Sequence, residues 1–67
     1  MTPADILAAR KALGLTQEQL ARVMGYGGKV RISEFEHGTR KPSDQALRLM
    51  RAYLEGYRPQ DWPGGVK

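Results

Sequence analysis

The stretch from Thr16 to Gly38 constrains the fold of this chain most, because it predicts two short helices joined by a glycine-rich turn. Thr16 and Gln19 stand at the spacing of a capping box, in which the threonine hydroxyl accepts a backbone amide and the glutamine reaches back to the cap. The first helix is therefore expected to begin at Gln17. Gly25 is expected to end it, because glycine adopts the left-handed conformation without a Cβ clash.

The second helix of this stretch, expected to end at Gly38, has two unlike faces. At about 100° per residue, Ile32, Phe35 and Glu36 point one way. The residues that point the other way are Val30, Ser33, Glu34 and His37, with Lys29 and Arg31 on the flanks. This outward face is short and polar, so it suits either the major groove of B-DNA or the solvated surface of a small helical bundle.

Two segments in this order, TQEQLARVMG and ISEFEHGTRKPS, resemble the helix-turn-helix of the lambda repressor and Cro family, often called the XRE family of transcriptional regulators. The resemblance covers roughly residues 6–54. It implies an all-α fold, a compact four- to five-helix lambda-repressor-like DNA-binding domain. We expect this domain to span residues 1–56 and to be followed by a C-terminal tail, residues 57–67.

The chain departs from the family pattern in the turn between the two helices. The residues YGGKVR separate Gly25 from Ile32, one residue more than the common pattern of the family. The additional residue either enlarges the turn or shifts the start of the second helix.

Length and charge limit the partners. A chain of 67 residues is expected to form one domain with a small core and no second catalytic or sensing domain. Its net charge of +4 suits a polyanionic partner. The absence of cysteine excludes disulfides and thiolate metal sites and is compatible with a reducing cytosol, so we expect a cytoplasmic protein.

The sequence shows no pattern typical of an enzyme, a metal site or a cofactor site. His37 is the single histidine, and the glycines of YGGK lack the Lys-Ser/Thr ending of a phosphate-binding loop. The apolar runs are far shorter than the roughly 18 residues that span a bilayer, and the N-terminus lacks the pattern of a signal peptide. We therefore expect no catalysis, metal, cofactor, small-molecule ligand or membrane partner.

Arg10 lies on the apolar face of a first helix that is expected to begin near Pro3 and to run to about Leu13. An ion pair with Glu36, which also faces inward, explains this placement. The resemblance implies the same pair, because the family commonly places an arginine and a glutamate at these two positions. A phosphate contact is the alternative role of Arg10.

The base contacts are expected in the N-terminal half of the second helix of the motif. Lys29 can donate to guanine, and Val30 can contact a thymine methyl group. Ser33 can donate or accept, and Glu34 can accept from the N4 amine of cytosine. Glu34 also has a local alternative, an ion pair with Arg31 or with Lys29.

The phosphate contacts are expected at both ends of the motif, from Thr16, Gln17, Arg31, Arg40 and Lys41. Free amides and the positive dipole end favour an anion where Gln17 begins its helix, and the resemblance implies the same contact. A surface glutamine is the alternative. Arg40 and Lys41 should each add roughly one unit to the salt dependence of DNA binding.

A last helix is expected from about Asp44 to Glu55, closed by Gly56. The residues expected to be buried along it are Ala46, Leu47, Met50 and Leu54. In the tail, Tyr57 and Trp62 either fold back over this helix or form a dimer contact with Tyr53. We favour the dimer, because the family commonly binds palindromic operators as two-fold dimers.

The resemblance implies a sequence-specific regulator of transcription that binds double-stranded DNA. Repression through a palindromic operator is expected, because so small a chain has little room for an activation or sensor domain. The alternative is a protein-binding module, an antitoxin or adaptor, that uses the same fold with Tyr53, Tyr57 and Trp62 as its interface. RNA binding ranks below both, because Phe35 faces inward and leaves no aromatic platform on the motif.

Overall fold

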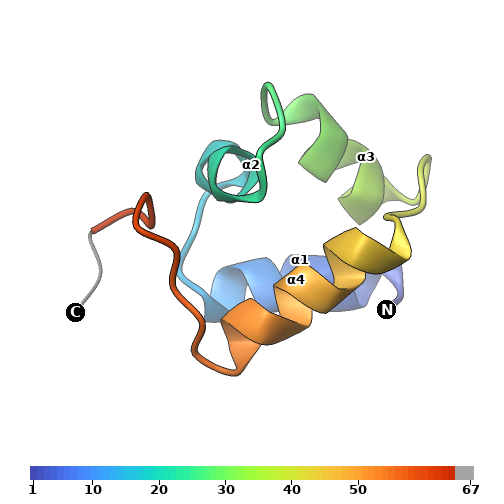
Figure 1. Ribbon diagram of the computed structural model, residues 1–67. Coiled ribbons are helices and arrows are strands. Elements are labelled where there is room, and N and C mark those ends of the chain that lie inside the picture. The colour runs from blue at the N-terminus through green and yellow to red at the C-terminus, as the bar shows by residue number, and fades with distance from the viewer. Residues whose placement is uncertain (65–67) are drawn as a thin grey trace.

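The computed structural model describes residues 1–64 of the chain, and all regular elements in this part are α-helices. The four helices are α1 (Pro3–Ala12), α2 (Gln17–Met24), α3 (Val30–His37) and α4 (Asp44–Leu54). Figure 1 shows α1 and α4 forming the base of the molecule, with α2 and α3 above them. The all-α prediction is therefore confirmed, with four helices rather than five among the described residues.

Two capping boxes fix the starts of α1 and α2. The Thr2 hydroxyl accepts from the Asp5 amide at 3.1 Å, and the Asp5 carboxylate accepts from the Thr2 amide at 2.9 Å. Thr16 and Gln19 form the same arrangement, with distances of 3.1 and 3.0 Å. Short-range side-chain chemistry thus determines where both helices begin.

Two glycines end the helices of the motif. Gly25 follows α2 with a φ of 87°, and Gly38 follows α3 with a φ of 80°. Both values lie in the left-handed region, where a side chain is unfavourable. A Cβ atom on Gly38 would also lie 3.3 Å from Cγ of Pro3, so α3 ends in close contact with the start of α1.

The turn between α2 and α3 accommodates its additional residue at the surface. The Tyr26 amide donates to the Ala21 carbonyl at 2.8 Å, and the Tyr26 ring packs edge-on against Phe35 with centroids 5.8 Å apart. Gly27 and Gly28 follow with open space at their Cβ positions. Tyr26 therefore anchors the turn to the core, and the extra length remains outside the packing.

The core fills the space between the four helices. Its fully buried large side chains are Ile6, Leu20, Ile32, Met50 and Tyr53. Two of the residues expected to be buried on α4 are not: Leu54 is 45% exposed and Leu47 is half-buried, whereas Tyr53 is 1% exposed. Ala46, Met50 and Tyr53 form the inward stripe of α4, and Leu54 lies beyond its edge at the end of the helix.

The described part of the tail folds back on α4. Trp62 is 9% exposed and meets the Tyr53 ring edge-on, with centroids 5.1 Å apart. The Arg58 guanidinium lies 4.3 Å from the centroid of Trp62 and donates to the Tyr53 carbonyl at 2.7 Å. Burial, with Tyr57 and Asp61 nearby, raises the pKa of Tyr53 to about 12, and its hydroxyl donates to the Val23 carbonyl at 3.2 Å.

This packing changes the dimer contact expected from the sequence. Tyr53 and Trp62 belong to the core of the single chain, so their rings are not presented at its surface. Tyr57 stacks on Tyr53 at a centroid distance of 6.1 Å and remains 54% exposed. The last part of the expected tail, residues 65–67, lies outside the described residues. Within residues 1–64, no helix combines the length and the hydropathy needed to cross a bilayer.

Candidate nucleic-acid interface

A polar clamp holds α3 against the two preceding helices. Arg10 Nε of α1 lies 2.6 Å from Glu36 Oε2 of α3, and Arg10 Nη1 donates to the Leu15 carbonyl at 2.9 Å. Gln17 Nε2 of α2 donates to Glu36 Oε1 at 2.9 Å. The Glu36 side chain is 5% exposed, so three helices converge on one nearly buried carboxylate.

The clamp keeps Glu36 ionised. Burial alone raises the pKa of its carboxyl. Hydrogen bonds from Arg10 and Gln17, together with the positive charge of Arg10, lower the pKa by more than burial raises it. The resulting pKa lies below the ordinary value of 4.5. Near neutral pH the carboxylate is therefore charged, and its inward position leaves the opposite face of α3 free.

The residues expected to contact bases lie together on that opposite face. Val30 is 68% exposed, Lys29 is exposed, and Ser33 and Glu34 are half-buried. These side chains line one shallow hollow together with Gln17, His37 and Thr39. The hollow combines donors, acceptors and an apolar surface, the groups that distinguish base edges in the major groove.

His37 closes the hollow at the C-terminal end of α3. Its Nδ1 lies 2.7 Å from the Ser33 carbonyl oxygen and 3.3 Å from Ser33 Oγ. Because a carbonyl only accepts hydrogen bonds, Nδ1 carries the proton in this arrangement. The periodicity of α3 placed His37 on the outward face, although we did not expect it among the DNA contacts.

Glu34 lies between two arginines. Its Oε1 is 3.3 Å from Nε of Arg31, one turn earlier in α3, and 3.3 Å from Nε of Arg40, in the loop after α3. The exposed fractions of the three side chains are 34% for Glu34, 44% for Arg31 and 52% for Arg40. The local pair with Arg31 was one of the alternatives for Glu34, whereas the pair with Arg40 was not expected.

Thr16 and Gln17 lie beside Lys29 in a second hollow at the start of α2. The Thr16 hydroxyl accepts from the Gln19 amide, and the Gln17 side-chain amide donates to Glu36, so both side chains already have structural partners. A phosphate at this position would meet the free backbone amides of the first turn of α2.

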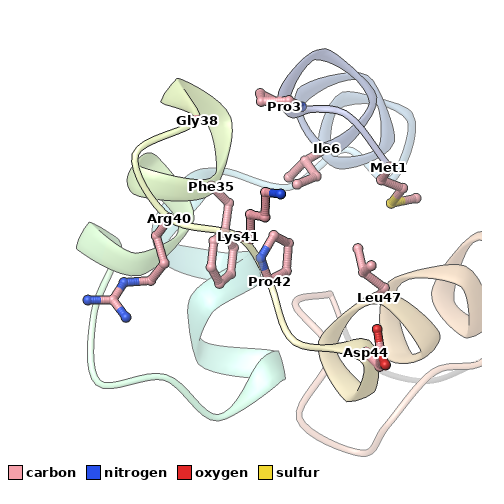
Figure 2. Close-up of a pocket in the computed structure, with 10 residues that line it drawn as sticks. All are labelled: Met1, Pro3, Ile6, Phe35, Gly38, Arg40, Lys41, Pro42, Asp44 and Leu47. Atoms are coloured by element: carbon pink, nitrogen blue, oxygen red, sulfur yellow. The ribbon is translucent and has the colours of Figure 1, made fainter.

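Arg40 and Lys41 belong to a loop that borders an apolar cleft between α1, α3 and α4. Figure 2 shows that the Arg40 guanidinium projects away from this cleft, while Pro42 faces it. Lys41 is exposed beside the cleft. Arg40 donates a hydrogen bond to Glu34, so of these two cations it is the one with a side-chain contact to α3.

The sequence pattern did not indicate two of these contacts. Gln17 was expected at a phosphate, whereas its side chain donates to Glu36; Arg40 was expected to be free for phosphate, whereas it pairs with Glu34. Gln17 and Glu36 are 19 residues apart, and Arg40 reaches Glu34 from the loop after α3, so neither contact follows from the period of one helix. The sequence offered one signal for the first contact. Glu36 faces inward on α3, and a buried carboxylate needs hydrogen-bond donors from neighbouring helices.

In α1, α2 and α3, the outward polar face of α3 is exposed while Glu36 on its inward face is held by α1 and α2. This arrangement defines a helix-turn-helix DNA-binding domain. A family model described as helix-turn-helix matches residues 6–62, most of the chain, so the chain belongs to this family, as a lambda repressor/Cro-like regulator of the XRE type. The family resemblance noted in the sequence is thereby confirmed. Comparison with curated proteins and with solved structures found no match.

Proposed function

We propose that this DNA-binding regulator is a sequence-specific repressor that inserts α3 into the major groove of a palindromic operator. The observation that carries the proposal is the outward face of α3, with Val30 68% exposed, on a helix whose inward face is fixed by the Arg10–Glu36 pair. A helix held in this way presents its side chains in one defined direction, as base recognition requires. Repression follows from occupancy of a promoter, which needs no further domain.

Four residues carry the base readout in this proposal. Lys29 and Ser33 offer hydrogen bonds, Val30 offers an apolar contact, and Glu34 offers an acceptor for cytosine N4. The four side chains line the same hollow, which supports a single footprint on a few adjacent base pairs.

The phosphate contacts flank this footprint. The first turn of α2, with Thr16 and Gln17, lies beside Lys29, and Arg31, Arg40 and Lys41 add positive charge from α3 and the loop that follows it. These contacts supply affinity and strong salt dependence but no choice of sequence.

A two-fold dimer would match a palindromic operator, with half-sites about 10 bp apart. Tyr57 and Leu54, three residues apart in the chain, are 54% and 45% exposed, and in this proposal they supply the apolar surface for the contact. Sedimentation of the protein with and without operator tests it: only monomer at micromolar concentration under both conditions would remove the dimer from the proposal. The burial of Tyr53 and Trp62 weakens the protein-binding alternative as much as the dimer contact first expected, so the exposed outward face of α3 is what favours DNA binding over it.

The experiment that tests the function is selection of bound duplexes from a random DNA pool, followed by titration of the winner and a scrambled duplex. An enriched inverted repeat is expected. Lys29→Ala should weaken binding to the winner more than Lys11→Ala does, because Lys11 is an exposed lysine on α1, outside both hollows. Equal affinity of the parent for both duplexes would refute sequence-specific binding.

A further inference from the structure

The Arg31–Glu34–Arg40 trio places a carboxylate where a DNA-binding surface needs positive charge. One carboxylate oxygen, Glu34 Oε1, lies 3.3 Å from the Nε atoms of both arginines. All three side chains are partly exposed, on the same side of the molecule as the hollow that contains Lys29, Val30 and Ser33. Glu34 belongs to both groups, because it also lines that hollow.

A phosphate that binds either arginine meets Glu34 as a competitor. Phosphate and carboxylate bind guanidinium through the same charged hydrogen bonds, so the two anions contend for Arg31 and Arg40. A phosphate held by one of these arginines also stands near a second negative charge, which repels it. The carboxylate therefore opposes binding to any duplex, whatever its sequence.

One base can remove this penalty. The N4 amine of cytosine donates a hydrogen bond in the major groove with no acceptor on the same base beside it, so it can satisfy a carboxylate. Guanine O6 and N7 and thymine O4 are acceptors that repel the carboxylate, and the N6 donor of adenine stands beside the N7 acceptor. A carboxylate placed over an acceptor loses water without gaining a partner, which is unfavourable. The same side chain thus favours cytosine most, favours adenine less because of the adjacent N7, and opposes guanine and thymine.

We infer that Glu34 is a specificity-determining residue that makes the phosphate contacts of Arg31 and Arg40 depend on a cytosine in the operator. In the free protein Glu34 pairs with both arginines and offsets one of their two positive charges. On the operator it turns to cytosine N4 and releases them to phosphates, whereas on other sequences it stays beside them and weakens the contacts. The inference rests on the proposed function and names one base that this function reads.

The test compares the parent protein with Glu34→Gln on the selected operator and on a scrambled duplex, over a series of salt concentrations. Surface ion pairs are weak, so the loss of two of them should tighten binding to the scrambled duplex by roughly 3- to 10-fold and steepen its salt dependence. Binding to the operator should stay equal or weaken, because the charged hydrogen bond from cytosine N4 is replaced by a weaker neutral one. The ratio of operator to scrambled affinity should therefore fall by roughly threefold or more.

Glu55→Gln is the matched control. It removes the same charge from an exposed position at the end of α4, and Glu55 has no ion pair among residues 1–64. Its effect on both duplexes should be equal and less than about twofold. Thermal melting of both variants checks that the fold is retained.

A second readout is the duplex selection itself. The parent should enrich a C·G pair at one position of each half-site. Glu34→Gln should shift the preference at that position toward adenine, which glutamine binds through N6 and N7, while the other positions stay unchanged. The inference is overturned if Glu34→Gln keeps the cytosine, or if it changes both affinities by the same factor, as a background charge would. If the parent itself does not distinguish the operator from the scrambled duplex, the proposed function fails instead.

Discussion

Replacement of Arg10 should destabilise the fold before it affects DNA binding. In Arg10→Met the apolar stem of the side chain is retained, but the contacts to Glu36 at 2.6 Å and to the Leu15 carbonyl at 2.9 Å are lost. Glu36 is then left as a carboxylate whose side chain is 5% exposed, with Gln17 as its remaining donor. Removing one partner of a buried pair costs about 3 to 5 kcal/mol, because the other charge stays buried.

The lower end of this range applies, because the Arg10 side chain is 15% exposed and solvent screens part of the interaction. A domain of 67 residues has a total stability of roughly 3 to 10 kcal/mol. A loss of about 3 kcal/mol would lower the melting temperature by roughly 12 to 24 °C for a domain of this size. Arg10→Met should therefore be partly unfolded at temperatures where the parent is fully folded.

The assay is thermal and urea denaturation followed by circular dichroism. Lys11→Met serves as the control, because it removes the adjacent, exposed positive charge and should change the free energy of unfolding by less than about 0.5 kcal/mol. Arg10→Met combined with Glu36→Leu removes both charges and should recover most of the lost stability. A melting temperature of Arg10→Met within about 4 °C of the parent would refute the clamp, since the expected loss is several times larger.

Three further predictions concern the same fold. Stability should fall as the pH drops below about 4.5, because a carboxyl with a lowered pKa contributes stability that is lost on protonation, and Glu36→Gln should flatten this decline in acid denaturation curves. Trp62→Ala should lower the free energy of unfolding by about 3 to 5 kcal/mol in urea titrations, whereas Tyr57→Ala, at an exposed ring, should cost much less; equal losses would contradict the packing of the tail. Gly38→Ala should cost about 1 to 3 kcal/mol from its positive φ, and a neutral effect on melting would show that the end of α3 adjusts.

The ends of the helices could be predicted from the sequence because they depend on neighbouring residues. Thr16 and Gln19 cap α2 through contacts three residues apart, and Gly25 and Gly38 end their helices through their own backbone conformation. Which side chain is buried near the end of α4 could not be predicted in the same way. Whether Tyr53 or its neighbour faces the core depends on where the tail returns, which periodicity along one helix does not encode.

The directions of the α3 side chains could also be predicted, whereas their partners could not. The helical period alone separates Val30 from Ile32, one exposed and the other buried. The contacts of Gln17 with Glu36 and of Arg40 with Glu34 depend on the distance between segments after folding. The sequence shows which charged and polar side chains can form ion pairs and hydrogen bonds, but tertiary packing decides which of them contact each other.

The turn between α2 and α3 offers a place where DNA recognition could be redesigned without changing the core. Gly27 and Gly28 have φ angles outside the left-handed region, and a Cβ atom at either position would face open space. Alanine at such positions typically stabilises a protein by about 0.4 to 1 kcal/mol, because the unfolded chain loses freedom. If α3 enters the major groove as proposed, larger side chains at these two positions, which directly precede Lys29 and the start of α3, would extend the contacting surface beside its footprint. A library that varies these two positions would therefore sample new operators while the packing of the domain stays constant.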